Sequence, residues 1–109
     1  MHEMSLALSV VEICAERAGG ARVRRVTLEI GALAAVMPDA IRFCFDICTQ
    51  QTVLEGAVLD IVEIAGRGRC RRCGSELPMP DFLAACGCGS IDIECIEGEA
   101  LRVREMEVS

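Results

Sequence analysis

CRRCG at residues 70–74 and CGCG at residues 86–89 decide how this 109-residue chain folds. The first segment is a CxxC pair, and the second pair, Cys86-Gly87-Cys88, follows Cys73 after twelve intervening residues. Two cysteine pairs at such a separation are typical of a closed zinc site, in which four thiolates surround a tetrahedral ion. The glycine after each pair lets the backbone turn toward the sulfur atoms. The spacing therefore predicts zinc bound by Cys70, Cys73, Cys86 and Cys88.

The segment around these cysteines, residues 66–99, has an unusual composition. It contains six of the ten glycines, two of the three prolines and five of the eight cysteines. A segment of fewer than roughly 40 residues usually needs a metal ion or disulfides to fold. We therefore predict a zinc-ribbon-like insertion. Cys95 is a possible substitute ligand, but its apolar neighbours Ile93 and Ile96 favour packing, and a thioredoxin-like redox role for CxxC is weaker because no strand-to-helix context surrounds it.

The flanking sequence predicts a small α+β layer. Apolar spacing indicates two helices, residues 4–18 (Leu6, Val10, Ile13 and Cys14) and 38–50 (Ile41, Cys44, Phe45 and Cys48). Strands are predicted at 22–30, 57–64 and 101–108, the first with Val26, Leu28 and Ile30 on one face. The expected fold is two helices on a three-stranded sheet. Residues 1–65 with 100–109 then form one domain, and residues 66–99 form the inserted domain.

The composition excludes several functional classes. The net charge is −6, which disfavours broad nucleic-acid binding, because that needs a basic face. There is no lysine and only one histidine, so a Schiff-base lysine, a P-loop lysine and a catalytic triad are excluded, and we expect no enzyme. No stretch is long and apolar enough for a membrane span, and no signal peptide is evident. We expect a cytoplasmic protein, whose reduced thiols favour metal binding over disulfides.

Two further groups have alternative interpretations. Four arginines lie within six residues: Arg67, Arg69, Arg71 and Arg72. One interpretation is a zinc-ribbon module that binds nucleic acid. A solvated loop that offsets thiolate charge is the better interpretation, because Phe82 is the one nearby aromatic residue and bases need aromatic side chains to stack on. Cys44 and Cys48 are four residues apart on the second predicted helix and in principle share a metal ion. Packing in the core is the better interpretation of this pair.

The N-terminus offers a second set of metal donors. The Met1 amine, the His2 backbone nitrogen and the His2 imidazole Nδ1 can chelate one ion in fused rings, and such a planar nitrogen set suits Ni(II) or Cu(II). The fourth ligand stays open: the Glu3 amide, a side chain, a water molecule or a group from a partner. A histidine at position 2 usually has no such role, because chain termini are solvated.

Several motifs together favour a metal-binding role for the N-terminus. They are Met1-His2-Glu3-Met4-Ser5-Leu6, Arg25-Val26-Thr27-Leu28-Glu29-Ile30-Gly31, Phe43-Cys44-Phe45-Asp46, Leu54-Glu55-Gly56, the paired cysteines, and Gly98-Glu99-Ala100-Leu101-Arg102-Val103. Over essentially its whole length the chain resembles the HypA/HybF family, the nickel metallochaperones of nickel–iron hydrogenase maturation. One departure is that the family's second cysteine pair is normally CPxC, whereas this chain has Cys86-Gly87-Cys88.

The resemblance implies a function, two metals and two partners. It implies a nickel domain of two helices on a three-stranded sheet, with a zinc domain inserted before the last strand. It implies Ni(II) bound by His2 with the Met1 amine and the neighbouring backbone, including Glu3, and structural Zn(II) bound by the four paired cysteines. It also implies nickel delivery to the hydrogenase large-subunit precursor together with the accessory GTPase HypB. We expect a monomer or a weak homodimer.

Overall fold

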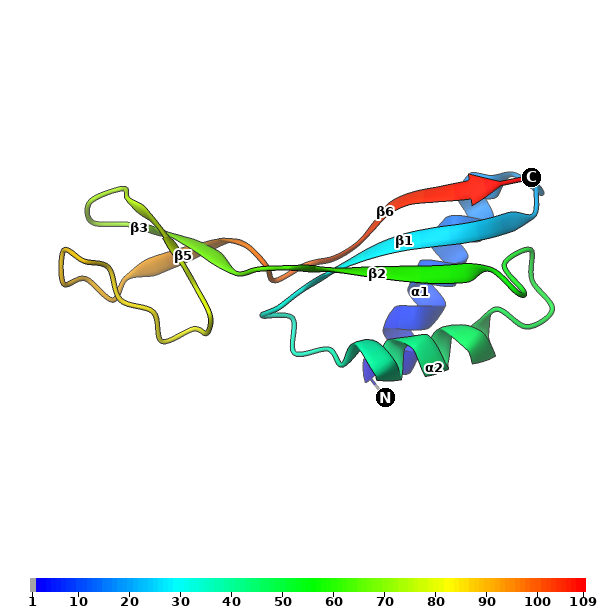
Figure 1. The fold of residues 1–109 in the computed structure, drawn as a ribbon, viewed down its shortest axis with the longest axis horizontal. Coiled ribbons are helices and arrows are strands. Elements are labelled where there is room, and N and C mark those ends of the chain that lie inside the picture. Colours follow the sequence, from blue (N-terminus) through cyan, green and yellow to red (C-terminus); the bar gives the residue numbers. More distant parts are fainter. Residues whose placement is uncertain (1) are drawn as a thin grey trace. The chain divides into compact units, whose positions relative to one another are not determined.

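The computed structural model describes residues 2–109 and confirms the predicted α+β class. Its elements are α1 (His2–Ala18), β1 (Val23–Gly31), α2 (Pro38–Cys48), β2 (Val58–Ile64), β3 (Arg67–Cys70), β4 (Glu76–Pro78), β5 (Ile93–Glu97) and β6 (Leu101–Val108). The strands form two three-stranded sheets, in the orders β2-β1-β6 and β4-β3-β5. In Figure 1, β1 lies between β2 and β6, as the sheet order requires.

The chain divides into two compact units. The first contains Met1–Leu28, Val36–Val62 and Arg102–Ser109, and the second contains Glu29–Ala35 and Glu63–Leu101. Both helices belong to the first unit, and the paired cysteines belong to the second. The interactions that stabilise each unit are therefore described separately.

The first unit is built on the buried face of β1. Val26 and Leu28 are fully buried. Ile30, in the part of β1 that belongs to the second unit, is 2% exposed, so the predicted alternation continues along the strand. The predicted stripe of α2 is also confirmed, since Ile41 and Phe45 are buried. Burying each such aliphatic or aromatic side chain contributes about 1.5–3 kcal/mol. Hydrophobic packing is therefore the main source of stability in this unit.

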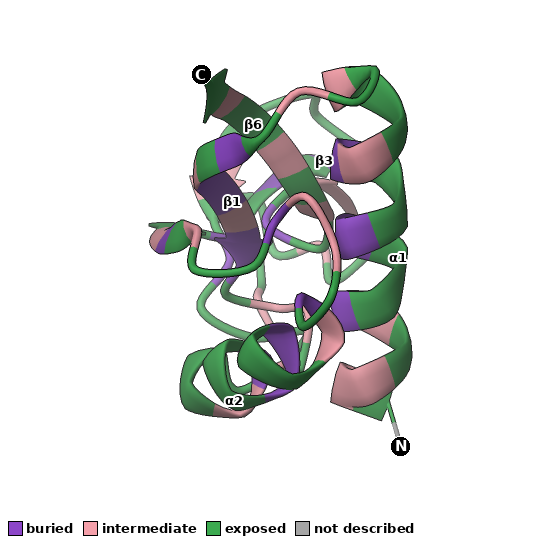
Figure 2. Ribbon diagram, turned by 90° about the vertical axis from the view of Figure 1, so that its right-hand side faces the viewer, coloured by how far each residue is buried: buried purple, intermediate pink, exposed green. Residues whose placement is uncertain are grey.

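The buried stripe of α1 differs from the prediction in two respects, because Leu6 is half-buried and Ile13 is exposed. Ala7, Val10, Val11 and Cys14 are buried, whereas Ile13 is 42% exposed. The i, i+3, i+4, i+7 spacing of these four residues defines one helical face, and Ile13 lies beside it. Figure 2 shows these buried positions along the side of α1 that faces β1. No described helix combines the length and the apolarity that crossing a bilayer requires.

The second unit contains strands that hydrophobic periodicity did not predict. β3 pairs antiparallel with both β4 and β5, with Gly68 opposite Leu77 and Cys95. Within the described residues 63–101, the buried hydrophobic side chains are Cys70 and Met79. These strands have only three to five residues each, too few for alternation of apolar side chains to reveal them. Residues 63–101 thus contribute very little hydrophobic core.

Three glycines of the second unit lie at the ends of strands. Gly31 is the last residue of β1, Gly66 comes just before β3 and Gly98 comes just after β5. A Cβ atom on Gly31 would lie 2.0 Å from the Gly98 carbonyl oxygen, and one on Gly98 would lie 2.5 Å from the Gly66 Cα. Backbone hydrogen bonds hold this contact, since Leu33 N donates to Gly98 O at 2.8 Å and Gly31 N donates to Ala100 O at 2.8 Å. Gly98 also has a φ of +99°, which side-chain-bearing residues rarely adopt. Glycine is therefore required here by close backbone packing.

We predict that Gly31→Ala destabilises the protein, because its new methyl group would overlap the backbone of Gly98. Overpacking of this kind typically costs about 1–3 kcal/mol, and more where backbone must move. Urea denaturation followed by circular dichroism measures the loss. Ala32→Ser, at an exposed neighbouring position, is the control and should change stability little. Equal stability of Gly31→Ala and the native chain would contradict this account.

Candidate metal centre

The first cysteine pair lies in a tight turn at the end of β3. Gly74 N donates to Cys70 O at 2.8 Å, and Cys70 N donates to Ser75 O at 2.8 Å. Gly74 has a φ of +79°, the left-handed conformation that glycine adopts without steric cost. The turn leaves Cys70 buried and Cys73 exposed.

The second pair lies in an equally tight loop, although it has one residue fewer between its cysteines. Gly89 N donates to Cys86 O at 2.9 Å, and Cys86 N donates to Ser90 O at 2.9 Å. Here the left-handed residue is Gly89, with a φ of +93°. As predicted, a glycine after each pair turns the backbone. The shortened spacing of Cys86-Gly87-Cys88 still forms a closed loop around both thiols.

The two loops bring the four sulfur atoms together. Cys70 Sγ lies 3.7 Å from Cys88 Sγ, and Cys73 Sγ lies 3.5 Å from Cys86 Sγ. All four sulfur atoms lie within 4.8 Å of one another. In a tetrahedron with metal–sulfur bonds of about 2.3 Å, the sulfur atoms are about 3.8 Å apart. The cluster therefore has the dimensions of a four-thiolate metal site.

The local hydrogen bonds favour thiolate in part of this cluster. The Ser75 hydroxyl and backbone lower the pKa of Cys73 to about 6. Hydrogen bonding to the backbone of Cys73 lowers the pKa of Cys70. The Ser90 backbone favours the thiolate of Cys88, but the Cys86 thiol and desolvation outweigh it and raise the pKa of Cys88 to about 11. Thiolate, the form that binds metal, is thus favoured at Cys73 and Cys70, and an ion must displace the proton from Cys88.

The other cysteines lie outside this cluster. Among the described residues, Cys70, Cys73, Cys86 and Cys88 are the one group of three or more histidine, cysteine or acidic side chains close enough to share an ion. Cys95 Sγ instead contacts Glu97 O at 3.3 Å. The sulfur geometry thus selects the four predicted residues.

Three of the four clustered arginines, Arg67, Arg69 and Arg71, are paired with acidic side chains. Arg67 forms ion pairs with Glu76 and Glu97, and Arg69 is 3.3 Å from Glu76. Arg71 forms two more, at 3.2 Å to Asp92 and 3.7 Å to Glu94. Sequence reasoning identified these arginines as a basic cluster but did not predict their acidic partners. Their charge is largely neutralised within the unit.

The predicted N-terminal donors lie at the start of α1. Met1 lies outside the described residues, His2 is exposed and Glu3 is half-buried. Because α1 begins at His2, the His2 and Glu3 amides are among the first four of the helix, which have no intrahelical acceptor. The imidazole and both amides are therefore not engaged in the helical hydrogen-bond ladder.

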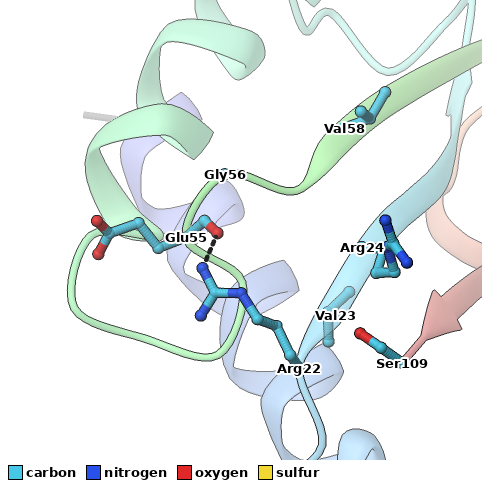
Figure 3. Close-up of a pocket in the computed structure, with 7 residues that line it drawn as sticks. All are labelled: Arg22, Val23, Arg24, Glu55, Gly56, Val58 and Ser109. Carbon is cyan, nitrogen blue, oxygen red and sulfur yellow. Dashed lines mark hydrogen bonds between the residues drawn. The ribbon is translucent and has the colours of Figure 1, made fainter.

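A separate pocket of about 430 Å³ lies in the first unit. Figure 3 shows Arg22 donating a hydrogen bond to the Glu55 carbonyl oxygen, at 2.7 Å, with Arg24 and Val58 on the other side. Its lining includes no thiol or imidazole. This pocket is not part of either set of predicted metal donors.

Comparison with known proteins identifies relatives over the full length. A family model described as "Hydrogenase/urease nickel incorporation, metallochaperone, hypA" matches residues 1–108. The chain is 56% identical to the hydrogenase maturation factor HypA of Nostoc punctiforme over 108 residues, covering 99% of this chain and 96% of the relative. It is 54% identical to HypA of Geobacter metallireducens over 109 residues, covering 99% of each chain.

Solved structures agree on the fold. The solution structure of the nickel metallochaperone HypA from Helicobacter pylori superimposes with a TM-score of 0.77 at 24% sequence identity. The match covers 97% of this chain and 96% of the other. A second solution structure, of a HypA protein, gives a TM-score of 0.70 and covers 97% and 92% of the two chains.

We predict that the arginine cluster does not confer nucleic-acid binding. Its ion pairs neutralise it, and the net charge of the chain is −6. A gel-shift assay with duplex and single-stranded probes at physiological salt should show no complex. Salt-dependent binding tighter than the roughly 10⁻⁴–10⁻⁶ M of non-specific association would instead favour the nucleic-acid module.

Proposed function

Because the chain belongs to the HypA family of hydrogenase maturation factors, metallochaperones for nickel incorporation and not enzymes, we propose that it carries Ni(II) at its N-terminus. In this proposal the Met1 amine and the backbone nitrogen and imidazole of His2 bind the ion. The fourth ligand is the Glu3 amide, a side chain, a water molecule or a group from a partner. The observation that carries it is the start of α1 at His2, which leaves both amides without helical acceptors. The exposed imidazole of His2 is accessible to an incoming ion.

The second part of the proposal is structural zinc in residues 66–99. Four sulfur atoms within 4.8 Å of one another, in two closed loops, support a site without an open coordination position. A site saturated by protein thiolates fixes the fold and leaves no position for cargo. We therefore assign nickel transport to residues 1–65 with 100–109, and zinc to the inserted residues 66–99.

The proposed recipients follow from the family's role in hydrogenase maturation. We propose that nickel passes to the hydrogenase large-subunit precursor, with the accessory GTPase HypB acting in the same step. A carrier of this kind acts within the cytoplasm, where its targets are assembled, and needs neither nucleic acid nor membrane.

We predict that Cys73→Ala releases zinc and disorders residues 66–99 while α1 and α2 persist. Structural zinc supplies about 10–16 kcal/mol of apparent binding free energy in small domains, far more than the two buried side chains of this segment supply. Elemental analysis should show zinc falling from about one equivalent to near zero. Amide NMR spectra should lose dispersion for the segment only.

Cys95→Ala is the matched control for this zinc experiment, because its thiol lies outside the cluster. It should keep its zinc. The ligand assignment is wrong if a chain with both Cys86 and Cys88 replaced still holds one zinc ion in a sulfur-only shell. X-ray absorption at the zinc edge makes that measurement.

We predict that nickel binding requires both the His2 imidazole and a free N-terminal amine. His2→Ala removes the one imidazole of the chain, and a short N-terminal extension keeps His2 but moves the amine away. Each should weaken nickel binding by at least about 10–100-fold, since loss of even an outer-shell partner has that effect at metal sites. A histidine-free C-terminal tag is the control, and calorimetric titration measures all four proteins.

Nickel affinity should also fall as the pH is lowered. Nickel displaces protons from the amine and the imidazole that bind it, so protons compete with nickel more strongly at lower pH. Affinity should therefore decrease from pH 8 toward pH 6. Unchanged binding by the N-terminally extended protein would show that the amine is not a ligand, and unchanged binding by His2→Ala would remove the proposed site altogether.

A further inference from the structure

Two sulfur-containing side chains meet where α1 and α2 pack together. Cys48 is the last residue of α2, and its Sγ lies 3.5 Å from Sδ of Met4, in the first turn of α1. The two residues are 44 positions apart in sequence, so only the packing of the helices brings them together. A thiol and a thioether are both soft metal ligands.

A third sulfur lies one helical turn earlier. Cys44 and Cys48 are at positions i and i+4 of α2, on the same face of the helix. Cys44 is 5% exposed, whereas Cys48 is half-buried and Met4 is half-buried. The group therefore combines one buried cysteine with two residues that are partly exposed.

A disulfide is not the natural use of this cysteine pair. Side chains at i and i+4 have Cβ atoms about 5–6 Å apart, whereas a disulfide needs about 3.5–4.5 Å. Forming it would require α2 to distort. A metal ion placed between the sulfur atoms bridges the larger separation while the helix stays intact.

We propose that Met4, Cys44 and Cys48 form a second metal site, which takes a soft monovalent cation of the Cu(I) class. Thiolate and thioether ligands suit soft ions such as Cu(I), whereas the closed zinc site of this chain has four thiolates and no thioether. On binding, the two thiols each release one proton to solvent, the thioether of Met4 donates without a proton change, and no electron is transferred. This inference does not rest on the proposed nickel function, since it uses none of the nickel donors.

The protonation of Cys48 agrees with this arrangement. Burial, and then the nearby Cys44 thiol, raise the pKa of Cys48. Without metal the thiol therefore stays protonated at neutral pH and weakly donates to Met4. Copper binding should strengthen as pH rises, because each bound thiolate has to lose its proton.

The test is an anaerobic titration of the zinc-loaded full chain with Cu(I) held by a competing colorimetric chelator. The first equivalent of Cu(I) should bind without zinc release, which a zinc indicator reports in the same cuvette. Cys48→Ala should abolish this phase. Met4→Leu, which keeps the volume of the side chain, should weaken it by at least about tenfold because one soft ligand is lost.

Two controls separate this site from the others. Cys95→Ala removes a half-buried thiol from the second unit, and His2→Ala removes the imidazole proposed for nickel. Both variants should still bind the first equivalent of Cu(I) without releasing zinc. Far-UV circular dichroism establishes that Cys48→Ala retains its helices, and Cys48→Ser is the substitute if it does not. Copper-edge X-ray absorption should report a shell of sulfur atoms alone.

Three outcomes would overturn the proposal. In the first, the initial equivalent of Cu(I) expels one equivalent of zinc, which would place copper at the paired cysteines. In the second, folded Cys48→Ala or Cys48→Ser binds Cu(I) as tightly as the native chain. In the third, His2→Ala abolishes the copper phase, which would place the ion at the N-terminus instead.

Discussion

The four-sulfur cluster is the constraint on which the second unit depends. Within the described residues 63–101, the buried hydrophobic side chains are Cys70 and Met79, and one of these is itself a proposed ligand. The arginine–carboxylate pairs of this unit are exposed, and such pairs contribute about 0–1 kcal/mol each. Neither source offsets the entropy of ordering strands of three to five residues. In the function proposed above, a metal ion bound by four thiolates supplies the missing stabilisation.

The contrast with the first unit explains which parts of the chain were predictable from sequence. Val26, Leu28 and Ile30 alternate along β1, and Ile41 and Phe45 recur along α2, because a hydrophobic core imposes the period of each element. The paired cysteines were predictable because ligand spacing is short and local. The nickel donors rest on a family resemblance and on the chemistry of a chain terminus, which no periodicity reveals.

The features that the sequence did not predict depend on contacts between residues far apart in the chain. β3 and β5 are short, and an ion pair between Arg67 and Glu97 joins them, so no apolar pattern marks them. Ile13 was assigned to the buried face because it is large and apolar, but the smaller Ala7 and Val11 occupy that face. The contact of Met4 with Cys48 spans 44 positions and depends on how two helices pack. Each of these needs three-dimensional information that one sequence does not contain.

The proposed nickel and zinc sites differ in how their donors are connected, and this difference fits their roles. The proposed zinc donors come from two loops, one after β3 and one before β5, joined by β4 and residues 79–85. Releasing the ion therefore requires both loops to separate. The proposed nickel donors are consecutive groups at one chain end, which can detach from the ion one at a time. Donor chemistry separates the two metals as well, because planar nitrogen sets suit Ni(II) while tetrahedral thiolate sets suit zinc. A carrier built this way retains its structural ion while it gives up its cargo.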